Sequence, residues 1–333
     1  MTTSTHPAAA SVLTRRTDFE KAIIVTRKTQ LEELLLRFHT PANARFYLEH
    51  AGGSFDPIAA THERYQAALR AVRRAVPGAL KQHVIDRGYL PQFLFSDADL
   101  VITLGPDGLV VNTAKYLHGQ PIVPVNPDPE TIDGILLPIS LRQVAATVKA
   151  TLQGKARMKR LTMAQARLND GQEILGVNDL FIGAQTHVSA RYEIAQGSTS
   201  ERHSSSGVIV STGVGSTGWL QSIYAGALGV VKALGGQVAV PPGGGRLPWD
   251  TDHLVYAVRE PFPSKTTATS MIFGVITRDR PLRLASHMAS DGVIFSDGIE
   301  ADYLPFNQGA LAEIGLADRQ TVLVTGGDRG HES

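Results

Sequence analysis

The sequence predicts an α/β + β protein in which an N-terminal doubly wound parallel α/β domain is followed by an antiparallel β-rich domain. Short apolar, β-branched runs alternate with helical stripes as far as residue 154, which is typical of a parallel sheet with crossover helices. Beyond that point strands dominate, separated by clusters of Gly, Pro, Ser and Asp. The length of 333 residues also favours two domains over one.

The first part consists of apolar strands separated by helices. Residues 22–26 are typical of a strand buried on both faces. Further strands are expected at 84–85, 100–104 and 122–125, the last weakened by its proline. Helical spacing is clear at positions 65, 69, 72 and 76, before Pro77-Gly78, and again at 141, 144, 148 and 152, while 109–118 reads as a shorter helix.

Strands of the second part are expected at 207–210, 254–258, 271–276 and 292–295. The predicted organisation is a flexible tail at 1–18, an α/β domain at 19–154, a β-rich domain at 155–323 and a flexible tail at 324–333. Packing of the C-terminal end of the second domain back onto the first is left open.

Composition excludes several classes of function. The net charge of +1 provides no basic field for nucleic acid or an acidic membrane surface. The absence of cysteine excludes disulfides and thiolate metal sites, and fits a reducing compartment. The most apolar stretch, residues 224–240, is interrupted by Lys232 and four glycines, so no transmembrane segment is expected. We therefore expect a soluble, cytoplasmic protein.

Gly105-Pro106-Asp107-Gly108 follows a predicted buried strand and precedes a helix, which is where open α/β sheets bind ligands. Glycines let the backbone approach phosphates, and one carboxylate can organise Mg²⁺ or accept a hydroxyl proton. The simpler interpretation is a strand-to-helix turn in which Asp107 caps the helix. Arg27 and Lys28, after the first strand, can contact a triphosphate or be ordinary surface cations.

Two later segments suit a polar ligand. Asn178-Asp179 places an amide beside a carboxylate, a pair that can bind a ribose diol or simply form a turn. In residues 204–219 a strand runs into alternating Gly, Ser and Thr, which expose backbone amides and hydroxyls to a ligand. Trp219, at the end of this segment, can stack on a base. A flexible connector is the simpler interpretation of such a composition.

Together these segments resemble the NAD kinase family. The GGDG turn, Asn-Glu pair and TPTGSTAY loop of that family occur in the same order as Gly105 to Gly108, Asn178-Asp179 and Thr212 to Trp219. The mitochondrial-type branch is most similar, through its VNxDP, SSG, GSxxW and REP patterns. These are matched by 125–129, 205–207, 215–219 and 259–261, and the resemblance covers residues 23–323.

The resemblance implies an NAD kinase that transfers a phosphoryl group from ATP or polyphosphate to the 2′-hydroxyl of the NAD adenosine ribose. Asp107 is implied to be the general base and to organise Mg²⁺ through the phosphates. Asp297-Gly298 matches the family's late DG turn. The nucleotide-binding residues implied are Gly105, Gly108, Asn126, Asn178, Asp179, Ser206, Gly215, Ser216, Thr217 and Trp219. Partners implied are small-molecule nucleotides and further copies of the chain, in a dimer or tetramer.

Several positions depart from the family pattern. Pro106 replaces a glycine and removes one backbone N–H, Asp179 is shorter than the usual Glu, and Ser206 replaces an Asp. Two alternatives follow: a non-catalytic protein that binds or senses NAD, and a kinase for a lipid or sugar hydroxyl. Retention of Asp107 favours an enzyme, and Asn178-Asp179 with the glycine-rich loop favours a dinucleotide.

Overall fold

A computed structural model of the chain describes residues 19–239 and 242–328. Its first sheet has seven strands, ordered β2-β1-β3-β4-β19-β6, with β5 also paired to β4. Strands β1 to β5 run parallel to their neighbours, and β19 is parallel to β4 but antiparallel to β6. The strands are β1 Lys21–Thr26, β2 Lys81–Asp86, β3 Asp99–Leu104, β4 Pro121–Asn126, β5 Ile139–Ser140, β6 Ala156–Leu161 and β19 Thr321–Asp328.

Helices cover both faces of this sheet, because its central strands are apolar on both sides. α3 (Asp56–Ala75) and α5 (Val144–Leu152) pack on one face, where Ile24 and Ile102 meet Val72 and Val148. α4 (Asp107–Ala114) and the 3-10 helix η1 (Arg87–Gln92) lie on the other face. The doubly wound arrangement predicted from the sequence is therefore confirmed.

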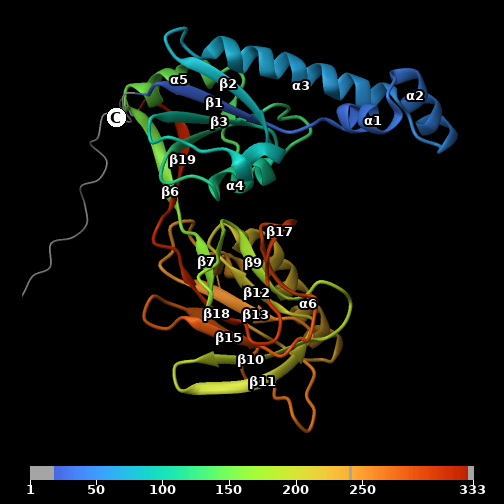
Figure 1. The fold of residues 1–333 in the computed structure, drawn as a ribbon, viewed down its shortest axis with the longest axis vertical. Coiled ribbons are helices and arrows are strands. Elements are labelled where there is room, and N and C mark those ends of the chain that lie inside the picture. The colour runs from blue at the N-terminus through green and yellow to red at the C-terminus, as the bar shows by residue number, and fades with distance from the viewer. Residues whose placement is uncertain (1–18, 240–241, 329–333) are drawn as a thin grey trace, which may run out of the picture.

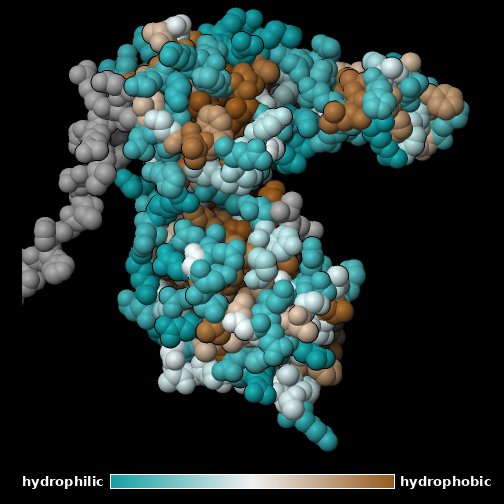
Figure 2. All heavy atoms as spheres, viewed as in Figure 1, coloured by the Kyte–Doolittle hydropathy of each residue, from teal (hydrophilic) through white to brown (hydrophobic). Residues whose placement is uncertain are grey.

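An arm projects from this layer at the N-terminal end of α3 (Figure 1). It contains α1 (Gln30–Phe38) and α2 (Pro41–His50), neither of which was predicted from the sequence. Thr29 and Glu32 form a capping box at the start of α1, which satisfies two backbone N–H groups there. A small separate core holds the arm together, and apolar side chains also gather on its surface (Figure 2).

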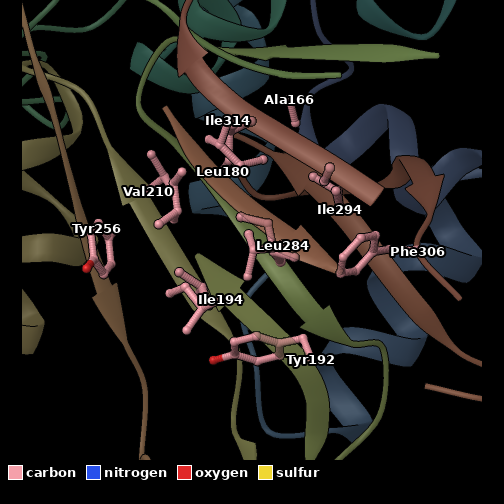
Figure 3. Close-up of a cluster of buried hydrophobic side chains, with 14 of the residues drawn as sticks. Ala166, Leu180, Tyr192, Ile194, Val210, Tyr256, Leu284, Ile294, Phe306 and Ile314 are labelled. Carbon is pink, nitrogen blue, oxygen red and sulfur yellow. The ribbon is translucent and has the colours of Figure 1, made fainter. Parts of the chain in front are cut away.

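The β-rich part is a sandwich of two six-stranded sheets. One is ordered β11-β10-β15-β18-β7-β8 and the other β14-β13-β12-β9-β16-β17. Side chains from both sheets, including Ile194, Leu284 and Leu180, meet in one buried core (Figure 3). The strands are β7 Ala164–Leu168, β8 Glu173–Gly176, β9 Asp179–Ala184, β10 Ala190–Gln196, β11 Thr199–Ser205, β12 Val208–Ser211, β13 Leu254–Val258, β14 Phe273–Ile276, β15 Leu282–Ser286, β16 Gly292–Ser296, β17 Ile299–Pro305 and β18 Leu311–Leu316.

A long helix, α6 (Trp219–Ala233), covers the outer face of the second of these sheets, and short 3-10 helices lie before and after it (η2, Gly215–Thr217; η3, Pro242–Gly245). No helix was expected over 219–233. The segment is apolar nearly all round and contains two glycines, so it shows no single hydrophobic stripe.

The chain enters and leaves the sandwich through two adjacent strands, β6 and β19, which both belong to the first sheet (Figure 1). β19 includes residues 324–328, which were expected to be part of a flexible tail. The domain limits drawn at 154 and 323 stay a prediction, and the tails at 1–18 and 329–333 lie outside the described residues. Within the described ranges, no helix is both long and apolar enough to cross a membrane.

Candidate active site

Polar residues gather at the carboxyl-terminal edge of the first sheet. Arg27 follows β1, Asp86 ends β2, the Gly105-to-Asp107 turn follows β3, and Asn126 ends β4. These four strands are neighbours and parallel, so their ends meet along one edge. Ligands of open α/β sheets bind at this edge.

Asp107 is the first residue of α4, but it does not cap the helix. The N-cap is Pro106, and no side-chain cap hydrogen bond is formed. Instead, the carboxylate accepts hydrogen bonds of 2.9 Å from the backbone N–H groups of Ile135 and Leu136, one at each oxygen. The helix-cap interpretation of Asp107 is therefore wrong. A carboxylate has about four acceptor sites, so two bonds leave it able to accept a proton or contact a cation.

The two glycines of this turn differ in their surroundings. A Cβ on Gly105 would lie 2.9 Å from Leu109 Cδ2, so this position is tightly packed. Gly108 is exposed, and a Cβ there would meet nothing within 4 Å. Between them Pro106 has φ −73° and ψ 171°, an extended conformation that proline adopts without strain.

Asn126 has a structural role in the turn after β4. Its amide donates a 2.9 Å hydrogen bond to the Ile132 carbonyl, and its carbonyl oxygen accepts one of 3.0 Å from the Asp128 N–H. The side chain is buried and both of its polar groups have partners. Asn126 thus shapes the loop that delivers residues 135–136 to Asp107.

Backbone hydrogen bonds to the Asp297 carboxylate hold the Asn178-Asp179 turn. The Asp297 carboxylate accepts hydrogen bonds from the backbone N–H groups of Asn178 (2.7 Å), Val177 (3.1 Å) and Asp179 (3.4 Å). Asp297 itself has φ 55°, followed by Gly298 at φ 69°, as the tight turn between β16 and β17 requires. Among the described residues, neither the Asn178 amide nor the Asp179 carboxylate has a side-chain hydrogen bond, which leaves both free for a ligand.

Burial of Asp179 changes its proton affinity. The residue is 8% exposed, and burial, followed by the charge of Asp297, raises its pKa to about 7. Burial also raises the pKa of Asp297 to about 6, although its backbone N–H partners and Lys115 oppose that rise. Two carboxylates in this setting disfavour a second negative charge, so a hydroxyl or cation that reaches Asp179 is stabilised.

The glycine-rich loop packs directly on this turn. β12 pairs with β9 so that Ser211 lies opposite Asp179. Thr212 donates its backbone N–H to the Asn178 carbonyl (2.9 Å), and a Cβ on Gly215 would lie 1.9 Å from the same oxygen. Only glycine fits such a contact, so the two segments predicted from sequence form one unit.

Ser216 and Thr217 serve the loop itself. The Ser216 hydroxyl donates to the Gly213 carbonyl (2.7 Å) and accepts from the Leu247 N–H (2.9 Å), and the residue is 1% exposed. The Thr217 hydroxyl donates to the Val214 carbonyl at 3.1 Å. Ser216 is thus a support of the loop, whereas the half-buried Thr217 remains partly accessible.

Helix α4 connects Asp107 to this unit. Val110 in α4 belongs to the same buried cluster as Val177, beside Asn178, and Val214, beside Gly215. At the other end of α4, buried Lys115 forms a 3.1 Å ion pair with Asp302 of β17, and Tyr116 donates to the same carboxylate at 3.0 Å. Helix α4, which begins with Asp107, therefore packs into the same core as residues next to Asn178 and Gly215, and the residues after its C-terminal end are tied to β17.

Trp219 packs in a different cluster from the one beside Asn178, and Ser206 lies at the other end of β12. The Trp219 ring stacks on Phe181 with the planes 7° apart, and the Arg259 guanidinium lies 5.4 Å from its centroid. Ser206 comes just before β12, whereas Ser211 is the last residue of that strand. At 3.3 Å per residue, the two serines are roughly 15 Å apart. Within one chain, Ser206 is not brought together with Asn178.

Arg27 lies beside the Gly105 turn. Its Cδ is 3.8 Å from the position of a Cβ on Gly105, and its backbone N–H donates to the Tyr65 hydroxyl at 3.3 Å. Tyr65 in turn donates to the Leu104 carbonyl at 2.9 Å, which ties β1 to β3. Lys28 is exposed next to it. Neither cation has an ion-pair partner in the part of the chain that the structure describes.

Sequence reasoning missed Lys115, Tyr65 and Asp302. Lys115 and Asp302 are 187 residues apart, and in the sequence each looks like an ordinary charged surface residue. No local pattern signals their pairing. Within residues 19–239 and 242–328, no group of three or more His, Cys, Asp or Glu is placed to hold a metal ion.

No family model matches this chain. An NAD kinase of Geobacter metallireducens is 28% identical over 161 residues, which is 45% of this chain and 56% of that protein. A probable NADH kinase of Oryza sativa subsp. japonica is 24% identical over 226 residues, covering 61% of this chain and 63% of that protein. The chain thus spans less than two thirds of the length of either relative.

Two solved structures share the fold over nearly the whole chain. Yeast NADH kinase complexed with NADH has a TM-score of 0.58 and 14% identity, covering 92% of this chain and 83% of that one. An NAD kinase from Archaeoglobus fulgidus in complex with ATP has a TM-score of 0.53 and 14% identity, covering 91% and 93%. The chain therefore has the two-part fold of the NAD and NADH kinases.

Proposed function

We propose that this protein is an NAD kinase, which transfers a phosphoryl group from a phosphate donor to the 2′-hydroxyl of the NAD adenosine ribose. One observation carries the proposal: the helix that begins with Asp107 shares a buried cluster with the residues beside Asn178 and Gly215. This shared core supports the proposal that the three sequence segments that resemble one family contribute to one site. The similarity to the Geobacter NAD kinase and the rice NADH kinase supports the same activity.

In the proposed reaction, the Asn178 amide and the Asp179 carboxylate bind the ribose hydroxyls of NAD. The 2′-hydroxyl oxygen then attacks the terminal phosphorus of the donor. Its proton passes to Asp107, the new P–O bond forms, and the bond to the leaving phosphate breaks. The N–H groups of Ile135 and Leu136 hold the Asp107 carboxylate in place for that transfer.

The residues at this edge are compatible with Mg²⁺. This ion is commonly held by one or two carboxylates together with substrate phosphates, and the Asp107 carboxylate retains free acceptor sites. Asp107 would hold it through the phosphates of the donor. When bound, the ion neutralises charge on the phosphates during transfer.

Further parts of the proposal rest on the sequence resemblance. We place the chain nearest the mitochondrial-type branch, because of the 205–207 and 259–261 patterns. We also propose a homo-oligomer in the cytoplasm, with nucleotides as its small-molecule partners. Residue Ser206, remote from Asn178 in the single chain, is then a candidate to act elsewhere in the assembly.

The decisive experiment is Asp107→Asn. We expect phosphorylation of NAD to slow by about 10² to 10⁴, because an amide accepts no proton. The amide oxygen still accepts one N–H of the 135–136 pair, so the free energy of unfolding should fall by only about 1 kcal/mol. Single-turnover kinetics, NAD titration calorimetry and urea unfolding measure the three effects.

The matched control is Asp133→Asn, an exposed carboxylate in the same loop. It should leave rate, NAD affinity and stability unchanged. Equal rates for Asp107→Asn and the parent would exclude Asp107 as the base. A parent that binds NAD and never turns over would favour the sensing alternative, and phosphorylation of lipid or sugar hydroxyls in preference to NAD would favour the other kinase class.

A further inference from the structure

Asp107 and the Asn178-Asp179 turn belong to different parts of the molecule. Asp107 follows β3 of the first sheet, whereas Asn178 precedes β9 of the sandwich and Asp179 begins it. The chain passes between the two parts at the neighbouring strands β6 and β19. A reaction that uses groups from both parts therefore depends on contacts that fix one part against the other.

Helix α4 makes such contacts, because it lies on the side of the first sheet that faces the sandwich (Figure 1). Asp107 is its first residue, and Lys115 and Tyr116 follow its last. The Lys115 ammonium lies 3.1 Å from the Asp302 carboxylate of β17, and the Tyr116 hydroxyl donates to the same oxygen at 3.0 Å. From the connection between β18 and β19, Arg319 donates to the Lys115 carbonyl at 3.1 Å. We call these four residues, Lys115, Tyr116, Asp302 and Arg319, the α4 anchor.

The cation of the anchor is held at a depth where it needs its partner. The Lys115 side chain is 4% exposed, and removal of one member of a buried ion pair leaves the other charge without compensation. The Asp302 side chain is 43% exposed, so it can be replaced without opening the core. Asp302 is therefore the position at which the anchor can be released.

Strand β17 links the anchor to the turn proposed to bind NAD. The strand that carries Asp302 begins directly after the 297–298 turn. In that turn the Asp297 carboxylate accepts the 2.7 Å hydrogen bond from the Asn178 N–H. A short path of helix, ion pair, strand and hydrogen bond thus runs from Asp107 to Asn178.

We propose that Lys115 and Asp302 are positioning residues for phosphoryl transfer, which set the separation between Asp107 and the Asn178-Asp179 turn. They act through α4 and β17 and not by contact with either substrate. Transfer requires the reacting atoms to be about 3 to 3.5 Å apart, and a displacement of about 1 Å can slow it about 10²-fold. NAD bound to the turn alone tolerates such a displacement. This inference rests on the proposed NAD kinase activity and adds residues that control its rate.

The kinetic test grades the loss of the anchor. Asp302→Ala removes both contacts to the end of α4, whereas Asp302→Asn keeps an acceptor for the Tyr116 hydroxyl. We expect the single-turnover rate constant at saturating NAD and ATP to fall at least about tenfold in the first and about threefold in the second. The Kd for NAD, from calorimetry, should stay within about twofold of the parent in both. A loss of folded molecules lowers the amplitude of the single turnover and not its rate constant, so it is distinguished from mispositioning.

The matched control is Glu313→Gln, which removes the carboxylate of an ion pair with Arg283 inside the sandwich. That pair is 3.0 Å long and both of its side chains are exposed. It joins two neighbouring strands, β15 and β18, and does not reach α4. Rate constant and Kd should equal those of the parent.

A second measurement needs no turnover. The chain has no cysteine, so two introduced cysteines can carry spin labels without a competing thiol. Leu94→Cys in the first part and Val188→Cys in the sandwich replace side chains that are 93% and 63% exposed. Label distances measured by double electron–electron resonance should have the same distribution in the labelled parent and in Glu313→Gln, and a broader or shifted one in Asp302→Ala.

An unchanged rate constant in Asp302→Ala, or an equal loss in Glu313→Gln, would overturn the positioning role. A lower rate constant with an unchanged label distribution would also overturn it, because the effect would not come from the separation of the two parts. A parent that does not phosphorylate NAD would instead overturn the proposed function, and the label distances would still show whether the anchor fixes the two parts.

Discussion

The Asp297 carboxylate accepts a 2.7 Å hydrogen bond from the backbone N–H of Asn178, a residue 119 positions earlier in the chain. The late turn between β16 and β17 thus sets the conformation of the turn proposed to bind NAD. Because the contact is to backbone, it leaves the Asn178 side chain free. A residue that touches no substrate can in this way control the binding site.

Replacing that carboxylate should damage both stability and binding. Asp297→Ala leaves the N–H groups of residues 177–179 without their acceptor, and we expect the free energy of unfolding to fall by about 2 to 4 kcal/mol. Affinity for NAD should fall as well. Asp297→Asn retains an acceptor oxygen and should have a smaller effect. Urea unfolding and NAD calorimetry test this, and equal stability of parent and Asp297→Ala would contradict it.

The contact between Gly215 and the Asn178 carbonyl allows no side chain. Gly215→Ala would place a Cβ 1.9 Å from that oxygen, so the turn must move. We expect a loss of about 3 kcal/mol or more in stability and at least a tenfold weaker affinity for NAD. Gly226→Ala in α6, where nothing lies within 4 Å, is the control and should be neutral or slightly stabilising. Intact NAD affinity in Gly215→Ala would show that the turn is not part of the site.

Asp179 should make stability depend on pH. Burial raises its pKa from 3.8 to about 7, so the native state binds more protons than the unfolded state between these values. The stability gained from this proton binding is fully present below about pH 4 and is lost as the pH rises through about 7. The free energy of unfolding of Asp179→Asn, relative to that of the parent, should therefore be higher at pH 8 than at pH 5, by about 2 to 4 kcal/mol. Parallel stability profiles from pH 4 to 8 would contradict this assignment.

A substitution at Gly108 distinguishes what the fold requires at this position from what a bound phosphate donor requires. A Cβ meets nothing there, so Gly108→Ala in α4 should raise the free energy of unfolding by about 0.5 to 1 kcal/mol. If phosphates approach this backbone, the same change raises KM for the donor severalfold. Thermal unfolding together with donor titrations measures both effects, and unchanged kinetics would remove Gly108 from the phosphate site.

The ion pair of Lys115 and Asp302 should couple α4 to the sandwich. Lys115→Met, Asp302→Asn and the double variant form a thermodynamic cycle, for which we expect a coupling energy of about 1 kcal/mol. The Lys115 side chain is 4% exposed and the Asp302 side chain 43%, so solvent screens part of the attraction. A coupling energy near zero would show that α4 is positioned by its apolar contacts alone.

Local patterns predicted the core strands well, because 22–26 and 100–104 are apolar on both faces and match only a buried parallel sheet. They did not predict α6, which lacks a hydrophobic stripe, or the arm helix α2, which depends on contacts with α1 and α3. The pairing partner of β6 also could not be predicted from local sequence patterns. It pairs with β19, about 160 residues later, and such a pairing leaves no trace in either segment.

The site was predicted in part. Asp107, Asn178 and Gly215 stood out because each lies just before or after an apolar strand, in a polar or glycine-containing segment of a kind that binds ligands. The proposal that they belong to one site came only from the family resemblance. Asn126 and Ser216 were expected to bind nucleotide, yet hydrogen bonds within the protein occupy their side chains. Composition alone does not distinguish a polar group that serves a ligand from one that serves a loop.

The insertion of β19 between β4 and β6 has a consequence for synthesis on the ribosome. Strand β6 ends at Leu161 and its partner begins at Thr321, so the first sheet stays incomplete while about 160 residues are translated. At about 5 to 20 residues per second, the delay is roughly 10 to 30 s. The β-sandwich, whose strands are contiguous in the chain, can fold during this interval. The edge of β4 that pairs with β19 therefore stays unpaired until the end of synthesis, and an unpaired strand edge promotes aggregation.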